Sequence, residues 1–169
     1  MKRAIIQHVR FASILAALSL LFVFAGCKKQ EAAPVVVAPL HAPASQADDK
    51  GWKAYFQDVI DRNSQGVTDR SMAYYLPPPG GADYEGMYAR QLSGVSDTVA
   101  RGVLPGNLLA FMSPDSTKMA DLVVAAFKNP SAGSMKGVIV IFIGKAGDND
   151  RVKTVVTQTG ATYRFVEAN

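Results

Sequence analysis

The 169-residue chain contains one cysteine, Cys27, and two histidines, His8 and His41. It therefore cannot form an intrachain disulfide. Residues 50–169 contain neither residue type, which excludes cysteine nucleophiles, histidine-dependent catalytic sets and the usual zinc ligands from that region. The formal net charge is +4, but three of the 18 basic residues lie in the first ten positions. The other 15 basic residues face 14 acidic ones, so no basic surface for nucleic acid is expected.

The N-terminus has the pattern of an export signal. Lys2, Arg3 and Arg10 give a cationic start, residues 11–26 carry no charge, and small residues precede Cys27. A charged segment, an apolar segment and small residues at the cleavage point are typical of secretion. The uncharged run is shorter than the roughly 17–25 residues that a membrane-spanning helix needs.

The segment Phe24-Ala25-Gly26-Cys27 resembles the lipobox of bacterial lipoproteins, although Phe24 stands where leucine is most usual. The resemblance implies cleavage before Cys27, a diacylglyceryl group on its sulfur and acylation of the new N-terminus. Lys28 follows in place of the aspartate that retains lipoproteins in the inner membrane, which resembles sorting to the outer membrane, facing the periplasm. An uncleaved anchor and a plain cleaved signal are the alternatives.

Three regions are predicted along the chain. Residues 1–26 are the signal peptide, and 27–49 are the lipidated cysteine with a tether rich in alanine and proline. Such a segment offers little patterned apolar surface to bury. Val35, Val36 and Val37 could alternatively form a brief strand. Residues 50–169 have an ordinary size for one globular domain.

The first predicted helix begins after Asp48 or Asp49 and ends at Gly66. Its apolar positions recur every three or four residues: Trp52, Tyr55, Phe56, Val59 and Ile60. A possible strand, 71–76, then runs into a proline-rich loop. The spacing of apolar residues predicts a second helix over 82–101.

The C-terminal third predicts alternating strands and helices. The strands are expected at 108–112, 138–143 and 162–167. Ser113 is expected to cap the first intervening helix, with proline and an acid following it. Asp148 or Asn149 is expected to cap the second. The order β-α-β-α-β predicts an α/β domain with a mainly parallel sheet, preceded by two helices and the proline-rich loop.

Two loops qualify as ligand sites because they follow strands of the predicted parallel sheet. One contains Ser113 and Asp115, and the other contains Lys145 and Asp148. Gly-Lys after a buried strand invites a phosphate-loop interpretation, but Ala146 replaces the required hydroxyl. No metal and no cofactor are predicted.

A second candidate surface combines tyrosines with prolines, which present stiff, amphipathic area at low entropic cost. Its members are Tyr74, Tyr75, Pro77, Pro78 and Pro79. The alternative is that the tyrosines fill the core and the prolines merely turn the chain.

The leading functional hypothesis is a membrane-anchored, non-enzymatic domain that binds a protein partner. It could be an immunity-type inhibitor of a periplasmic toxin or an accessory subunit of an envelope or secretion assembly. The alternative is binding of a small ligand or a cell-wall glycan. A hydrolase that uses carboxylates alone, such as Asp58 and Asp61 one helical turn apart, ranks third.

Overall fold

The fold, taken from a computed structural model, is described for residues 38–169. The predicted signal, Cys27 and Val35–Val37 lie outside the described residues. A parallel sheet is formed by β1 (Ser71–Tyr75), β2 (Leu108–Met112), β3 (Ile139–Gly144) and β4 (Thr162–Glu167). The strands lie in the order β1-β2-β3-β4, which confirms the predicted α/β fold and adds residues 71–75 to the sheet.

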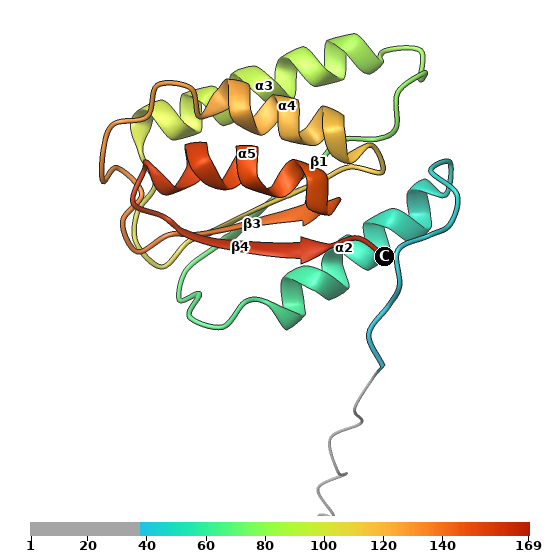
Figure 1. The fold of residues 1–169 in the computed structure, drawn as a ribbon, viewed down its shortest axis with the longest axis horizontal. Helices are drawn as coiled ribbons and strands as arrows, with labels where there is room; N and C mark the ends of the chain where they lie inside the picture. The colour runs from blue at the N-terminus through green and yellow to red at the C-terminus, as the bar shows by residue number, and fades with distance from the viewer. Residues whose placement is uncertain (1–37) are drawn as a thin grey trace, which may run out of the picture. The chain divides into compact units, whose positions relative to one another are not determined.

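The helices cover both faces of the sheet (Figure 1). They are α2 (Asp49–Arg62), α3 (Tyr84–Arg101), α4 (Ser116–Ala126) and α5 (Ala146–Thr157). Parallel crossovers are right-handed, and each one here moves one strand further in the same direction, so α3, α4 and α5 share one face. The other face is covered by α2. None of the helices within residues 38–169 is long and apolar enough to cross a membrane.

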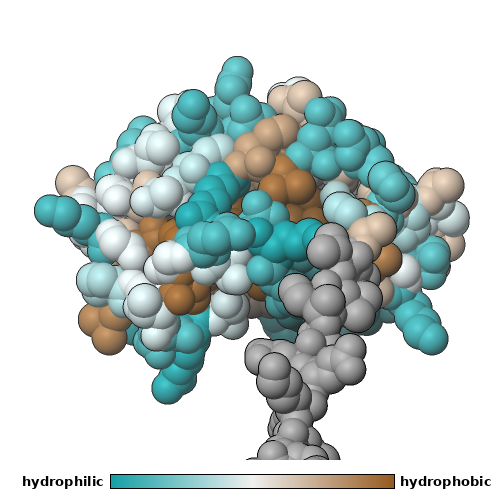
Figure 2. All heavy atoms as spheres, turned by 90° about the horizontal axis from the view of Figure 1, so that it is seen from below, coloured by the Kyte–Doolittle hydropathy of each residue, from teal (hydrophilic) through white to brown (hydrophobic). Residues whose placement is uncertain are grey.

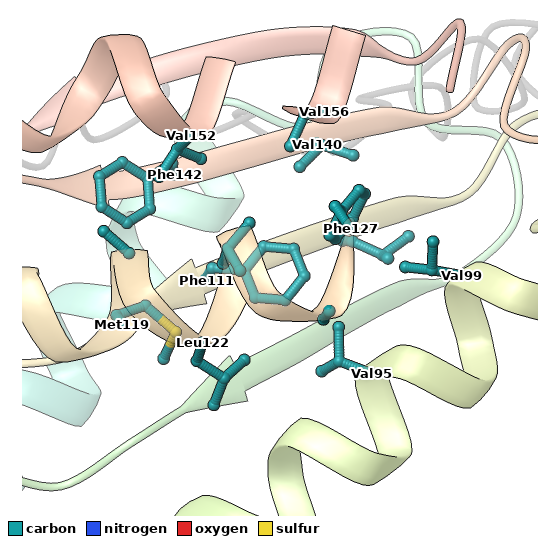
Figure 3. Close-up of a cluster of buried hydrophobic side chains, with 14 of the residues drawn as sticks. Val95, Val99, Phe111, Met119, Leu122, Phe127, Val140, Phe142, Val152 and Val156 are labelled. Atoms are coloured by element: carbon teal, nitrogen blue, oxygen red, sulfur yellow. The ribbon is translucent and has the colours of Figure 1, made fainter. Parts of the chain in front are cut away.

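The core between the sheet and the three connecting helices is built on aromatic and aliphatic side chains (Figure 3). Phe111 and Phe142 project from the two central strands and are fully buried. Phe127 packs edge-on against Phe111, with ring centroids 6.1 Å apart. Val95 and Val99 bring the inner face of α3 onto this cluster. Each such side chain contributes about 1.5–3 kcal/mol by leaving water.

The opposite face of the same strands packs against α2. The alternate residues of β2 and β3 point toward this helix and are buried: Leu108, Ala110, Met112, Ile139, Ile141 and Ile143. The predicted apolar stripe of α2 meets them, from Trp52 to Ile60. Because helices cover both faces, every residue of β2 and β3 is buried, and both strands are almost entirely apolar in sequence.

Three predicted helix boundaries are wrong. Asp115, and not Ser113, caps α4, and its side chain accepts a hydrogen bond from the Lys118 N–H at 3.1 Å. Ser113 instead bonds the Asp115 N–H at 3.0 Å, which turns the chain out of β2 before the helix starts. Helix α5 begins at Ala146, before Asp148. Helix α2 ends at Arg62 and not at Gly66, and the Asn63 N–H bonds carbonyls of its last turn.

The compact unit begins at Ala38, earlier than the residue 50 expected from composition. The Leu40 N–H donates to Asp58 at 3.1 Å, and the Ala42 N–H donates to the Asn169 carbonyl at 3.2 Å. The Trp52 indole N–H donates to the Ser45 carbonyl at 3.0 Å. The last part of the predicted tether therefore contacts the folded domain. Asp48 caps α2, as predicted.

Candidate functional site

The two predicted ligand loops lie side by side at the carboxyl edge of the sheet, because β2 and β3 are neighbours. A hydrogen bond joins them: Ser116 Oγ donates to Asp148 Oδ2 at 2.6 Å. The same hydroxyl accepts from the Lys145 N–H at 2.8 Å. The start of α4 is thus bonded directly to the start of α5.

Arg151 completes the environment of Asp148. It donates to Asp148 Oδ1 through Nε at 3.1 Å and through Nη2 at 2.7 Å. It also pairs with Asp121 at 2.5 Å. Burial raises the pKa of Asp148, but the hydrogen bonds from Ser116 and Arg151 outweigh it, so this pKa lies below its usual range. Hydrogen bonds and an ion pair within the domain therefore stabilise the charged Asp148 carboxylate, and no ligand is needed to do so.

A shallow pocket of about 310 Å³ lies at the same edge. The segment 42–46 lines it together with Trp52, Pro114, Lys145 and Ala168. Its polar groups also bond internally. Lys145 Nζ donates to the Ala168 carbonyl at 2.8 Å, and Gln46 Nε2 donates to the Pro114 carbonyl at 3.0 Å.

The strand order bears on this pocket. Ligands of open parallel sheets bind where the strand order reverses, because neighbouring loops there diverge to opposite faces. The order β1-β2-β3-β4 contains no reversal. The loops that follow β1, β2 and β3 therefore do not part into a crevice of this kind. The ligand loops at Ser113, Asp115, Lys145 and Asp148, which are expected from their position after strands, stay a prediction.

The tyrosines of the second candidate surface pack inward, on opposite faces of the sheet. The Tyr74 ring stacks on Phe111, with centroids 5.0 Å apart and planes at 9°. Tyr75 contacts Phe56 from α2 at 6.4 Å, and Lys53 Nζ lies 5.4 Å from the Tyr75 ring centroid. Burial and the nearby Asp49 carboxylate raise the pKa of Tyr75.

The prolines that follow lie progressively further out. Pro77 and Pro78 are half-buried, and Pro79 is exposed. The structure thus matches the core interpretation for the tyrosine rings. It leaves the proline loop and the outer edge of β1 as the accessible part of this surface.

The acid pair considered for hydrolysis is engaged along α2. Asp58 bonds Arg62 at 2.9 Å, and this hydrogen bond lowers the pKa of Asp58. Asp61 accepts from Gln57 at 2.8 Å. Each carboxylate therefore has its own neighbour on the helix. Among residues 38–169, no group of three or more histidine, cysteine, aspartate or glutamate side chains could hold a metal ion.

Sequence reasoning did not find the connection from Ser116 through Asp148 to Arg151, nor the contribution of segment 42–46 to the pocket. Both depend on contacts between distant parts of the chain. The only local signal was the acid in the first turn of α5, which was interpreted as a cap.

The chain matches no family model, no curated protein and no solved structure. Its function is therefore inferred from its own residues and geometry.

Proposed function

We propose that this protein is a lipid-anchored protein of the bacterial envelope whose domain acts by binding a protein partner. The lipid anchor is proposed because the segment Phe24–Cys27, which resembles a lipobox, stands at the end of an uncharged run. Two or more acyl chains hold a protein stably at a bilayer, whereas one holds it only marginally. We further propose that the anchored domain faces the periplasm from the outer membrane.

The anchor is tested by changing Cys27→Ser in the full chain and separating membranes from soluble material. We expect the variant to leave the membrane fraction or to accumulate as an unprocessed precursor, and to lose fatty-acid labelling. Lys28→Ser is the matched control and should remain anchored. Lys28→Asp should move the protein from the outer to the inner membrane. Mature-size Cys27→Ser protein in the membrane fraction would refute the anchor.

Partner binding is supported by where the polar side chains point. At the carboxyl edge, Ser116, Asp148 and Lys145 bond one another or the backbone, so their polar groups are already satisfied within the domain. Figure 2 shows one face of the domain, on which hydrophobic patches are separated by hydrophilic residues. A mixed surface of this kind suits a reversible protein contact, because such interfaces are about as apolar as the rest of a protein surface.

Partner binding is tested in cells by photo-crosslinking from the exposed position Pro79. The control crosslinker stands at Lys128, which is exposed two residues beyond the end of α4. We expect one envelope protein to be captured from the first position and not from the second. Equal capture from both positions, or capture from neither, would count against a specific partner.

The second candidate function is binding of a small ligand or a cell-wall glycan, and the pocket beside Trp52 and Lys145 favours it. A ligand at 100 times its dissociation constant would raise the free energy of unfolding by about 2.7 kcal/mol. Thermal unfolding with glycan fragments tests this directly. A shift that Lys145→Met abolishes would replace the protein-binding proposal.

A further inference from the structure

The outer edge of β1 presents backbone groups that no strand pairs. The Leu108 N–H donates to the Arg70 carbonyl at 2.8 Å, and the Leu76 N–H donates to the Met112 carbonyl at 3.1 Å. These two bonds, with the parallel register of β1 and β2, assign the ladder to the even-numbered residues of β1. The N–H and C=O groups of Ser71, Ala73 and Tyr75 therefore point outward, at an edge of the sheet.

The side chains along this edge leave it accessible. Ser71 and Ala73 are small and exposed on the face that carries α2. Proteins usually protect an open edge with lysine, proline or a covering segment. In β1 the first proline comes only after the strand, at position 77. The other edge is occupied at its end, where the Tyr55 hydroxyl donates to the Glu167 carbonyl at 3.5 Å and the Ala42 N–H donates to the Asn169 carbonyl at 3.2 Å.

A hollow of about 410 Å³ adjoins the start of β1. Its apolar lining includes Met72, Val103 and Leu104. Leu104 is 75% exposed, the largest value among the big hydrophobic side chains of residues 38–169. In the free protein the Leu104 side chain stays in contact with water, so burying it against a partner would be favourable.

Two arginines stand at this hollow. The Arg70 side chain is 85% exposed, and its Nε lies 3.9 Å from the nearest Asp69 oxygen. Arg101, at the end of α3, is exposed and has no carboxylate partner within residues 38–169. The carboxylate of Asp69 also lines the hollow and accepts from Asn107 Nδ2 at 3.1 Å. The hollow therefore has an apolar wall and, with two arginines and one carboxylate, a rim of net positive charge.

We propose that β1 is the docking strand for the partner, which adds an extended segment to its outer edge. This inference rests on the proposed function and specifies the partner's chemistry. The added segment bonds the backbone of Ser71, Ala73 and Tyr75, places an apolar side chain against Leu104 and directs a carboxylate to Arg70 and Arg101. Main-chain hydrogen bonds supply affinity in this mode, and alternate side chains supply specificity.

The first experiment uses the full chain in detergent and an end-capped octapeptide in which every second residue is threonine and the residues between alternate valine with aspartate. In a strand this spacing places valine and aspartate on the same face. We expect saturable binding at peptide concentrations below about 1 mM. Hydrogen exchange at the amides of Ser71, Ala73 and Tyr75 should slow in the complex. A peptide with lysine in place of aspartate should bind about tenfold more weakly. No saturable binding, or no protection of these three amides, overturns the inference.

The second experiment blocks the edge without breaking the sheet. The outward N–H of Ala73 makes no ladder bond, so Ala73→Pro removes a docking donor at a position where an edge strand tolerates proline. We expect about tenfold weaker peptide binding, whereas Ala73→Ser retains it. Arg101→Glu should abolish the preference for aspartate, and Arg90→Glu, elsewhere on α3, should not. Unfolding curves establish that the variants are folded.

The outcomes separate this inference from the proposed function. An envelope partner that binds the Ala73→Pro and Ala73→Ser proteins equally would overturn docking on β1 and leave partner binding intact. A concentration-dependent dimer that Ala73→Pro dissociates would identify a second copy of the chain as the occupant, which also overturns the proposal. Loss of membrane attachment in Cys27→Ser bears only on the anchor.

Discussion

The Ser116 hydroxyl donates to the Asp148 carboxylate at 2.6 Å, although the two residues are 32 positions apart in the chain. The bond joins the first turns of α4 and α5 at the edge where parallel sheets commonly place their ligands. Arg151 also bonds Asp148, so both oxygens of this carboxylate have partners within the domain. The role of this junction between α4 and α5 is therefore structural, and stability measurements can test it.

Loss of either member of the junction should destabilise the fold. Ser116→Ala leaves one Asp148 oxygen and the Lys145 N–H without this hydroxyl, and Asp148→Asn removes the charge that Arg151 binds. We expect the free energy of unfolding in urea to fall by about 1–3 kcal/mol for each. Asp150→Asn, at an exposed neighbouring position, should change it by less than about 0.5 kcal/mol. Equal effects at positions 148 and 150 would contradict a structural role for the junction.

Asp148 should also make the free energy of unfolding depend on pH. The pKa of Asp148 is lower in the folded protein than its ordinary value of about 3.9. Its stabilising contribution is therefore complete above that ordinary value and is lost as the pH falls through the folded-state pKa. Urea unfolding of the original protein and of Asp148→Asn should give curves that converge between about pH 4 and pH 2. A stability difference that stays constant over that range would contradict this assignment.

Gly144 and Gly94 should respond oppositely to alanine. A Cβ at Gly144 would lie 2.5 Å from Ser116 Oγ and 2.8 Å from the Phe142 ring. Gly144→Ala should therefore cost about 1–3 kcal/mol through overpacking. Gly94 lies inside α3 with nothing within 4 Å of such a Cβ, so Gly94→Ala should stabilise by about 0.5–1 kcal/mol. Thermal unfolding of the two variants measures both effects, and shifts of the same sign would contradict the packing described.

Sequence patterns predicted the helices and strands well, because the apolar spacing that identifies each element lies within a short stretch of the chain. Apolar spacing predicted the strands at 108–112 and 138–143, and the apolar stripe of α2 consists of the residues that pack on the sheet. The cap of α4 was misplaced by two residues because two groups compete for the first turn. Ser113 and Asp115 both suit a cap, and only the exit geometry of β2 decides between them.

The candidate sites were harder to predict. Neither the strand order nor the bond from Ser116 to Asp148 can be derived from spacing, since both depend on which strands become neighbours. The inward packing of Tyr74 and Tyr75 was an open alternative for the same reason. The accessible edge of β1 follows only from its place at the end of the sheet and from the parity of its hydrogen bonds.

Arg164 should hold the loop after α2 against the sheet. It projects from β4 and donates to the carbonyl of Asn63 and, at 2.7 Å, to that of Gln65. Arg164→Met retains much of the aliphatic stem but removes these donors, so we expect a loss of about 1–3 kcal/mol and faster amide exchange in residues 63–67. Arg90→Met, which breaks an exposed pair with Asp83, should cost less than about 1 kcal/mol. Unchanged exchange in that loop would contradict this role.

Removing the hydroxyl of Tyr84 or of Tyr163 should change stability in opposite directions. Tyr84 is 5% exposed, and its hydroxyl is buried without a hydrogen-bond partner. Burial, with the nearby Asp115 charge, raises the pKa of Tyr84 to about 12. Because an unsatisfied buried group costs about 1–3 kcal/mol, Tyr84→Phe should be neutral or stabilising in urea unfolding. The Tyr163 hydroxyl bonds Asn149 Oδ1 at 3.0 Å, so Tyr163→Phe should instead lose about 0.5–1.5 kcal/mol. A clear destabilisation by Tyr84→Phe would contradict an unsatisfied hydroxyl at this position.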